Sequence, residues 1–191
     1  MRSSHGEHWL GLTLLAGALA PAPPAIAADF LTAEAAQRAL FPEADAFAPV
    51  AIALDADARQ RVLAAAGTQP RHGALQVWAA RRNGELLGHV FVDEVLGRVD
   101  LITYAAGIDT AGRLRTPEIL SYRESHGGEI RAAGWRRQFA GRSGLEALRP
   151  GRDIRNIAGA TLSCEHVTQG IRWLLAMWQA ALRPVGAAAG A

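Results

Sequence analysis

The sequence predicts a mixed α+β domain in which an antiparallel sheet of consecutive strands is covered by a C-terminal amphipathic helix. Between residues 75 and 122, short apolar segments are separated by turn sequences such as Asn83-Gly84 and Asp109-Thr110-Ala111-Gly112, a pattern typical of strands joined by tight turns. From residue 163 to 182, apolar residues recur at helical spacing. A sheet with one apolar face and a helix with one apolar stripe can bury each other.

Residues 1–27 are predicted to be a secretory signal peptide. Arg2 supplies a basic start, residues 10–20 are apolar, and Ala25-Ile26-Ala27 has the small-x-small pattern of a cleavage site. The apolar stretch of about 11 residues is short for a membrane span, which needs about 20. We therefore expect a periplasmic or otherwise extracytoplasmic protein that begins at or next to Ala28 and has no transmembrane span after cleavage. The alternative is a disordered leader rich in alanine and proline.

Residues 28–70 are predicted to form an N-terminal helical segment. Thr32 is the expected N-cap of a first helix, and Asp55 or Asp57 is the expected N-cap of a second one. Gly67 follows the second helix, where a glycine commonly ends a helix. The expected elements are a helix at 32–40, a strand at 47–54 and a helix that ends at residue 66.

Residues 71–184 are predicted to form the main domain, and residues 185–191 a frayed tail. The expected strands are 75–79, 86–95, 99–106 and 114–122, with Gly97-Arg98 as the turn before the third. The helix at 163–182 carries its apolar stripe on Val167, Ile171, Leu174, Leu175, Trp178 and Leu182. Arg172 and Gln179 argue against a transmembrane span for this helix.

The composition excludes several kinds of chemistry. All twenty basic residues are arginine, so no lysine is present for a Schiff base or for a phosphate-binding loop of the Walker type. Cys164 is the only cysteine, which excludes an internal disulfide and cysteine-based haem, iron–sulfur or zinc motifs. We expect no metal site.

Charge is distributed unevenly along the chain. Residues 28–110 contain 7 arginines and 11 acids, whereas residues 111–191 contain 12 arginines and 6 acids. The basic half suits an anionic ligand or partner. The arginines are scattered among apolar positions without a recognisable nucleic-acid module, so a small phosphate-bearing ligand fits better than nucleic acid.

The segment directly before the C-terminal helix carries the strongest chemical signal. Gly159 and Ala160 allow a ligand to approach the backbone closely, and Thr161 and Ser163 place hydroxyl groups at the predicted helix start. Free N–H groups and the helix dipole favour a phosphate there. The segment therefore predicts an anion-binding cradle. The alternative is that Gly159-Ala160 is only a tight turn and Ser163 an ordinary N-cap.

The run from Ala158 to Ser163 resembles the S-G-A-T-x-S signature of the extracytoplasmic FMN-binding domain. That domain occurs in the FMN subunits of the Rnf and Nqr electron-transport complexes and in related periplasmic flavoproteins. The resemblance implies a fold like that of the FMN-binding domain, to which a transferase joins FMN through a phosphoester on Thr161. It also implies close approach of the flavin at Gly159 and Ala160, with Ser163 near the phosphate.

Two positions differ from the family pattern. The family usually has Ser or Thr three residues before the modified threonine and Asp six residues before it, where this chain has Ala158 and Arg155. Asp153, eight residues before Thr161, fits an extended form of the motif. Covalent attachment is the expected form, and non-covalent binding of FMN is the alternative.

The resemblance extends over residues 75–182. Residues 119–130 resemble the family's glutamate-containing, glycine-rich loop beside the flavin, and residues 135–141 resemble its W-x-x-Q-F-x-G stretch. Further cofactor-binding residues implied in this way are Glu124, Ser125, His126, Gly127 and Trp135. Each has a plain alternative: Glu124 can pair with a neighbouring arginine, His126 can be solvated, and Trp135 can fill the core.

The expected function is that of an exported FMN-binding electron-transfer protein. Flavins exchange one or two electrons, and no residue needs to act as a general base. The expected partners are the FMN transferase during maturation and a redox protein, which can be membrane-bound. Two alternatives stay open: a non-flavin binding or interaction module of the same fold, and a small flavin-dependent reductase with Glu124 and His126 as acid–base candidates.

Overall fold

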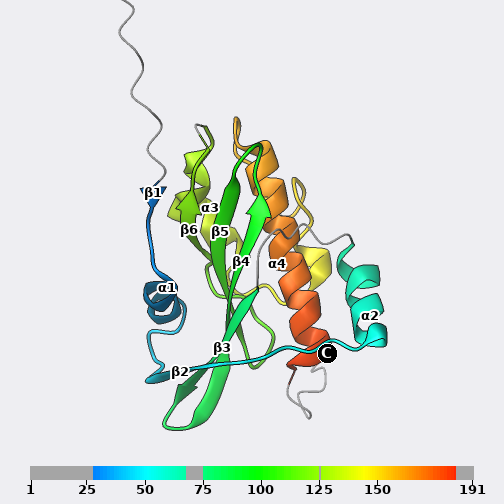
Figure 1. The fold of residues 1–191 in the computed structure, drawn as a ribbon. Coiled ribbons are helices and arrows are strands. Elements are labelled where there is room, and N and C mark those ends of the chain that lie inside the picture. The colour runs from blue at the N-terminus through cyan, green and yellow to red at the C-terminus, as the bar shows by residue number, and fades with distance from the viewer. Residues whose placement is uncertain (1–27, 68–74, 125, 184–191) are drawn as a thin grey trace, which may run out of the picture.

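The computed structural model describes residues 28–67, 75–124 and 126–183, so the predicted signal peptide, Ser125 and the predicted tail lie outside the described residues. The protein has an α+β fold with one antiparallel sheet in the strand order β1-β6-β5-β4-β3-β2 (Figure 1). This confirms the predicted fold class. The strands are β1 (Ala28–Asp29), β2 (Ala46–Pro49), β3 (Gln76–Arg82), β4 (Glu85–Leu96), β5 (Leu101–Asp109) and β6 (Glu118–Tyr122).

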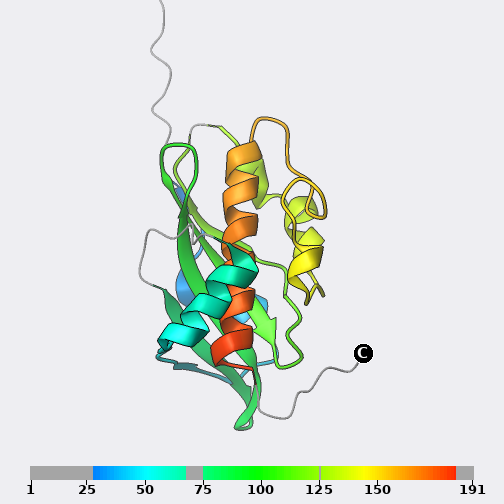
Figure 2. The same ribbon diagram turned by 90° about the vertical axis from the view of Figure 1, so that its right-hand side faces the viewer.

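Helices cover both faces of the sheet. The α-helices are α1 (Ala33–Leu40), α2 (Ala56–Ala66), α3 (Ala133–Arg136) and α4 (Thr161–Ala181), and the 3-10 turns are η1 (Gly128–Arg131), η2 (Arg137–Phe139) and η3 (Leu145–Ala147). Helix α4 packs on one face over β4 and β5, and α1 packs on the other. Helix α2 lies against the outer side of α4 (Figure 2).

The two short N-terminal helices have the predicted caps. Thr32 Oγ1 accepts a hydrogen bond from the Ala35 amide at 3.2 Å, and Asp55 Oδ1 accepts one from the Ala58 amide at 2.6 Å. Gly67 ends α2 with a φ of 78°, in the left-handed region that glycine adopts at low cost. These local signals could be interpreted from the sequence because both partners of each bond lie within one helical turn.

The strands β3 to β6 follow one another in the predicted meander. Asn83 and Gly84 both have positive φ, 51° and 81°, as the type I′ hairpin turn requires. The turn after β5 is also as predicted, with the Gly112 amide donating to the Asp109 carbonyl at 2.9 Å. The sheet is therefore built from local hairpins, with β1 and β2 added at its two edges.

Some predicted boundaries were wrong. The strand predicted at 47–54 is only β2, which ends at Pro49, a residue without an N–H donor to continue the ladder. The strand predicted at 114–122 begins after Pro117 and leaves Leu114 in an isolated bridge to Ile108. The strand predicted at 99–106 corresponds to β5, which begins at Leu101 and ends at Asp109. The short strand β1 was not predicted.

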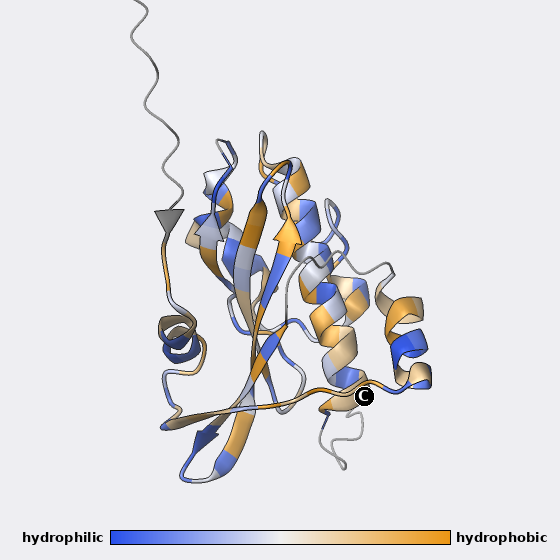
Figure 3. Ribbon diagram, viewed as in Figure 1, coloured by the Kyte–Doolittle hydropathy of each residue, from blue (hydrophilic) through white to orange (hydrophobic). Residues whose placement is uncertain are grey.

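Helix α4 carries the predicted apolar stripe into the core. Val167, Ile171, Leu174 and Leu175 are fully buried, and hydrophobic and hydrophilic residues are interleaved along the helix (Figure 3). At Gly170 the helix approaches the sheet so closely that a Cβ atom would collide with the Tyr104 hydroxyl. No helix within the described ranges combines the length and the apolar character that a membrane crossing requires.

A buried histidine connects α4 to the sheet. Trp178 Nε1 donates a hydrogen bond of 3.2 Å to Nδ1 of His89, which is 6% exposed. Burial, and secondarily the charge of Arg81, lower the pKa of His89 below its usual value. The bond requires His89 to be neutral at Nδ1, because a protonated ring would only donate.

We expect the protein to lose stability as the pH falls below about 6.5, the ordinary pKa of histidine. His89 binds a proton more weakly in the folded state than in the unfolded state. The contribution of neutral His89 to stability is therefore fully present above that pH, and it is lost as the pH falls toward the lower pKa that His89 has in the folded state. Urea unfolding at pH 7.5 and at pH 5 measures this loss. His89→Gln, which keeps an acceptor without titrating, should reduce the loss. An equal loss in the wild-type protein and the variant would contradict the assignment.

Candidate functional site

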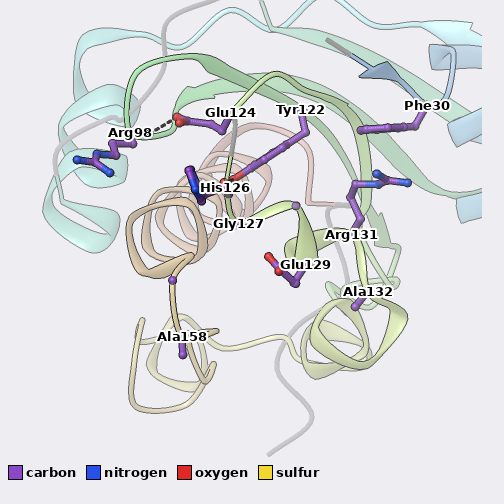
Figure 4. A pocket seen from close by; sticks show the side chains of 12 residues that line it. Phe30, Arg98, Tyr122, Glu124, His126, Gly127, Glu129, Arg131, Ala132 and Ala158 are labelled. Atoms are coloured by element: carbon purple, nitrogen blue, oxygen red, sulfur yellow. Dashed lines mark hydrogen bonds between the residues drawn. The ribbon is translucent and has the colours of Figure 1, made fainter. Parts of the chain in front are cut away.

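Two adjoining pockets lie where α4 begins, beside the β4–β5 turn and the end of β6. Their volumes are about 940 Å³ and about 580 Å³, which is in the range of small-molecule sites. Both are lined by Arg98, Glu124, His126 and Gly159, so they form one continuous depression. We call them the larger pocket and the smaller pocket; Figure 4 shows the larger one.

The fold brings most of the predicted site residues together at this depression. Its lining includes Glu124, His126, Gly127, Gly159, Ala160, Thr161 and Ser163. Ser125 lies outside the described residues. Trp135 lines neither pocket. The loop after β6 and the start of α4, which are far apart in the sequence, therefore contribute to one site.

Trp135 fills the core, as the alternative interpretation of this residue expected. Its side chain is 4% exposed and meets the Phe139 ring edge-on at 5.2 Å between centroids. Its indole Nε1 donates to the Arg155 carbonyl at 2.9 Å. Trp135 therefore does not lie with the other cofactor-binding residues that the resemblance implies. The residue instead anchors the segment that leads into the start of α4.

The start of α4 is open. Gly159 has a φ of 85° and no heavy atom within 4 Å of where a Cβ would lie. The helix begins at Thr161 with no side chain capping it, and the Cys164 amide donates to the Ala160 carbonyl at 2.9 Å. The amides of the first helical turn precede this bond and are oriented to meet an anion.

The two hydroxyl groups of this turn have different surroundings. Thr161 is exposed at the smaller pocket. Ser163 is 4% exposed, and its Oγ lies 3.2 Å from the Tyr122 hydroxyl oxygen. Ser163 is therefore not the N-cap, because the helix begins two residues earlier than predicted. Its hydroxyl connects α4 to the sheet, and Thr161 alone presents an exposed hydroxyl at this turn.

Tyr122 holds the site together, and the sequence analysis did not identify it. Its hydroxyl donates to the His126 carbonyl at 2.5 Å and also meets Ser163. Gly127 has a φ of 86°, and a Cβ there would lie 2.6 Å from the Tyr122 hydroxyl and 3.0 Å from Ala160 Cβ. Burial raises the pKa of Tyr122 above its usual value. The sequence analysis assigned Tyr122 to a strand and to the stretch 119–130 but gave it no role, because its partner Ser163 is distant in the sequence.

Glu124 stabilises the β4–β5 turn. Its Oε1 accepts hydrogen bonds from the backbone amides of Arg98, of Val99 at 2.8 Å and of Asp100 at 3.2 Å. Three backbone amides thus converge on one carboxylate oxygen. The contact also brings the turn, with Arg98, to the mouth of both pockets (Figure 4).

The larger pocket also contains an aromatic residue and an arginine that the sequence analysis missed. The Arg131 guanidinium lies over the Phe30 ring, with 3.6 Å between Cζ and the ring centroid. Phe30 belongs to the N-terminal segment, which the family resemblance does not cover. No local sequence signal places Phe30 here, because its position depends on the pairing of β1 with β6.

Of the motif positions before Thr161, Ala158 lines the larger pocket, whereas Asp153 and Arg155 line neither pocket. Asp153 Oδ2 accepts from Arg149 Nε at 2.6 Å, and this bond is the main reason that the pKa of Asp153 is lowered to about 2. The Arg155 backbone is held by Gln138, whose Oε1 accepts from the Arg155 amide at 2.9 Å. Cys164 is fully buried, and burial raises the pKa of its thiol, so it behaves as a small core residue.

No cluster of three or more potential metal-ligating His, Cys, Asp or Glu residues is present in the part of the chain that the structure describes. A comparison of the sequence with protein-family models finds no match, and neither does a comparison with curated proteins.

Proposed function

We propose that this protein is an exported FMN-binding electron-transfer protein whose flavin is attached through a phosphoester to Thr161. The observation that supports this most is the exposed Thr161 residue at the uncapped start of α4, opening into a depression of nucleotide size. The resemblance of residues 158–163 to the flavin-attachment signature supports the same residue.

The donor groups around the depression suit FMN. The first-turn amides of α4 and the Arg98 side chain provide positive charge for a phosphate next to Thr161. The larger pocket, which continues from there, has the volume for a planar ring system. At Gly159, no heavy atom lies within 4 Å of the position that a Cβ atom would occupy, so the approach to Thr161 is open.

When bound, FMN would supply one- and two-electron transfer. The chain would hold and tune the cofactor. During maturation Thr161 Oγ would form the bond to phosphorus as the transferase breaks the bond from that phosphorus to the leaving group of its flavin-nucleotide donor, and the hydroxyl proton and the leaving group would depart with the transferase. The arginines at the pockets would stabilise negative charge on the cofactor. Tyr122 would keep the loop at Gly127 pressed against the start of α4. No side chain needs to act as an acid or a base in this function.

The partners proposed are an FMN transferase during maturation and a redox protein in operation. Both must reach the opening at Thr161, where Val99 is 71% exposed and Leu162 is 46% exposed. Apolar side chains that flank an opening suit transient protein contacts. The arginine-rich half of the chain would favour a partner with an acidic surface.

The geometry disfavours the small reductase alternative. Glu124, one of its two acid–base candidates, uses Oε1 to accept from three backbone amides, so this carboxylate is engaged in supporting the β4–β5 turn. Two measurements separate the functions. A flavin absorption spectrum on protein co-expressed with a transferase supports the carrier, and a colourless product supports the non-flavin module. Turnover of a small substrate without a protein partner would support the reductase.

Export is proposed on the sequence of residues 1–27. We expect the mature protein recovered from cells to begin at or next to Ala28. N-terminal sequencing of the protein from the extracytoplasmic fraction measures this directly. Recovery of only the intact chain, from the cytoplasm, would contradict the export proposal and leave the flavin proposal standing.

A further inference from the structure

The Phe30–Arg131 pair lies in the larger pocket and outside the smaller pocket, which Thr161 lines. Phe30 is fixed by its backbone, since its amide donates to the Leu120 carbonyl at 2.7 Å next to the β1–β6 pairing. Arg131 ends the turn η1, which follows directly on the Gly127 loop. Both residues line the larger pocket and neither lines the smaller one. The N-terminal segment and the Gly127 loop thus build one wall of the larger pocket.

The chemistry of this wall suits a flat aromatic ligand. A guanidinium group stacked on a phenyl ring, here 3.6 Å from its centroid, combines a planar surface with a positive charge. Tyr122 and His126 also line the pocket with aromatic rings, and the Tyr122 hydroxyl is bonded to the His126 carbonyl and meets Ser163. Figure 4 shows Phe30 and Arg131 side by side at the pocket.

We propose that Phe30 and Arg131 bind the ring system of the ligand, and that Arg131 favours the ring when it carries negative charge. The inference rests on the proposed function, because it assigns the ring end of a flavin whose phosphate end lies at Thr161. It gives the N-terminal segment a part in binding. It also makes Arg131 a residue that raises the reduction potential of the bound flavin, since a cation stabilises the anionic reduced form.

Riboflavin separates the two ends of the site, because it has the ring and lacks the phosphate. We would titrate riboflavin and FMN into the full chain carrying Thr161→Ala, which cannot form the phosphoester, and follow the quenching of flavin fluorescence. Phe30→Ala and Arg131→Gln should each weaken the binding of both ligands by about tenfold. Phe30→Tyr keeps the ring and should bind within about twofold of the parent protein.

Arg137→Gln is the matched control for charge. Arg137 is an exposed arginine in the next 3-10 turn and lines neither pocket. It should leave riboflavin affinity unchanged. In protein with covalently attached flavin, Arg131→Gln should lower the reduction potential relative to Arg137→Gln, and Phe30→Ala should increase the fluorescence of the attached flavin in the native state. Thermal unfolding of each variant establishes that it is folded.

The outcomes separate this inference from the proposed function. If flavin attaches to the wild-type chain but Phe30→Ala and Arg131→Gln leave affinity, fluorescence and potential unchanged, the ring-binding wall is wrong and the flavin function stands. If Arg137→Gln lowers the potential as much as Arg131→Gln, the effect is one of overall charge, and the inference is also wrong. If neither the wild-type chain nor the Thr161→Ala chain takes up flavin, both proposals fail.

Discussion

Thr161→Ala is expected to abolish covalent flavin while the protein stays folded. In the proposed attachment the threonine hydroxyl is the reacting group, and its side chain is exposed at the first position of α4, so the substitution removes little buried area. Denatured wild-type protein made with the transferase should keep flavin fluorescence on a gel. Its mass should exceed that of the bare chain by one FMN less one water, and the variant should show neither signal.

Two further substitutions make this test specific. Thr161→Val has nearly the same volume without a hydroxyl and should fail to attach flavin as Thr161→Ala does. Ser163→Ala should keep the covalent flavin, because the Ser163 hydroxyl meets Tyr122 inside the protein; its loss should cost about 1 kcal/mol of stability. Fluorescence that survives denaturation of Thr161→Ala, or flavin released from denatured wild type, would show that Thr161 is not the attachment residue.

Leu174→Ala is expected to cause the largest loss of stability, about 2–5 kcal/mol. Leu174 is fully buried in the cluster between α4 and the sheet, and truncation leaves a cavity that the rigid sheet cannot fill. Urea unfolding measures the change in the free energy of unfolding. Leu175→Ala, at an equally buried position, should fall in the same range.

Gln179→Ala is the control on the same helix. Gln179 is exposed, and its one hydrogen bond, to the Ser143 carbonyl, is long at 3.5 Å. The expected change is within about 0.5 kcal/mol. Losses of equal size at positions 174, 175 and 179 would mean that α4 is not packed on the sheet as described.

The elements that the sequence predicts correctly are those with short-range causes. Thr32 and Asp55 cap helices through amides three residues away, and Asn83-Gly84 forms its turn through its own dihedral angles. The stripe on α4 follows from helical periodicity alone. The boundaries that were wrong lie at Pro49 and after Pro117, because apolar periodicity continues past these residues although a proline has no N–H donor for the ladder.

The amino-acid sequence by itself determined the meander and the covering helix, and it predicts the segment at 158–163 as the place for a phosphate ligand. Only the tertiary structure decided which side chains share that place. In the structure Trp135 lies in the core, the Ser163 hydroxyl meets the Tyr122 hydroxyl, and the Arg131 guanidinium lies over the Phe30 ring. The reason is that dihedral preferences and periodicity act over a few residues, whereas these contacts join residues from different elements and exist only once the strands have paired and α4 has packed on the sheet.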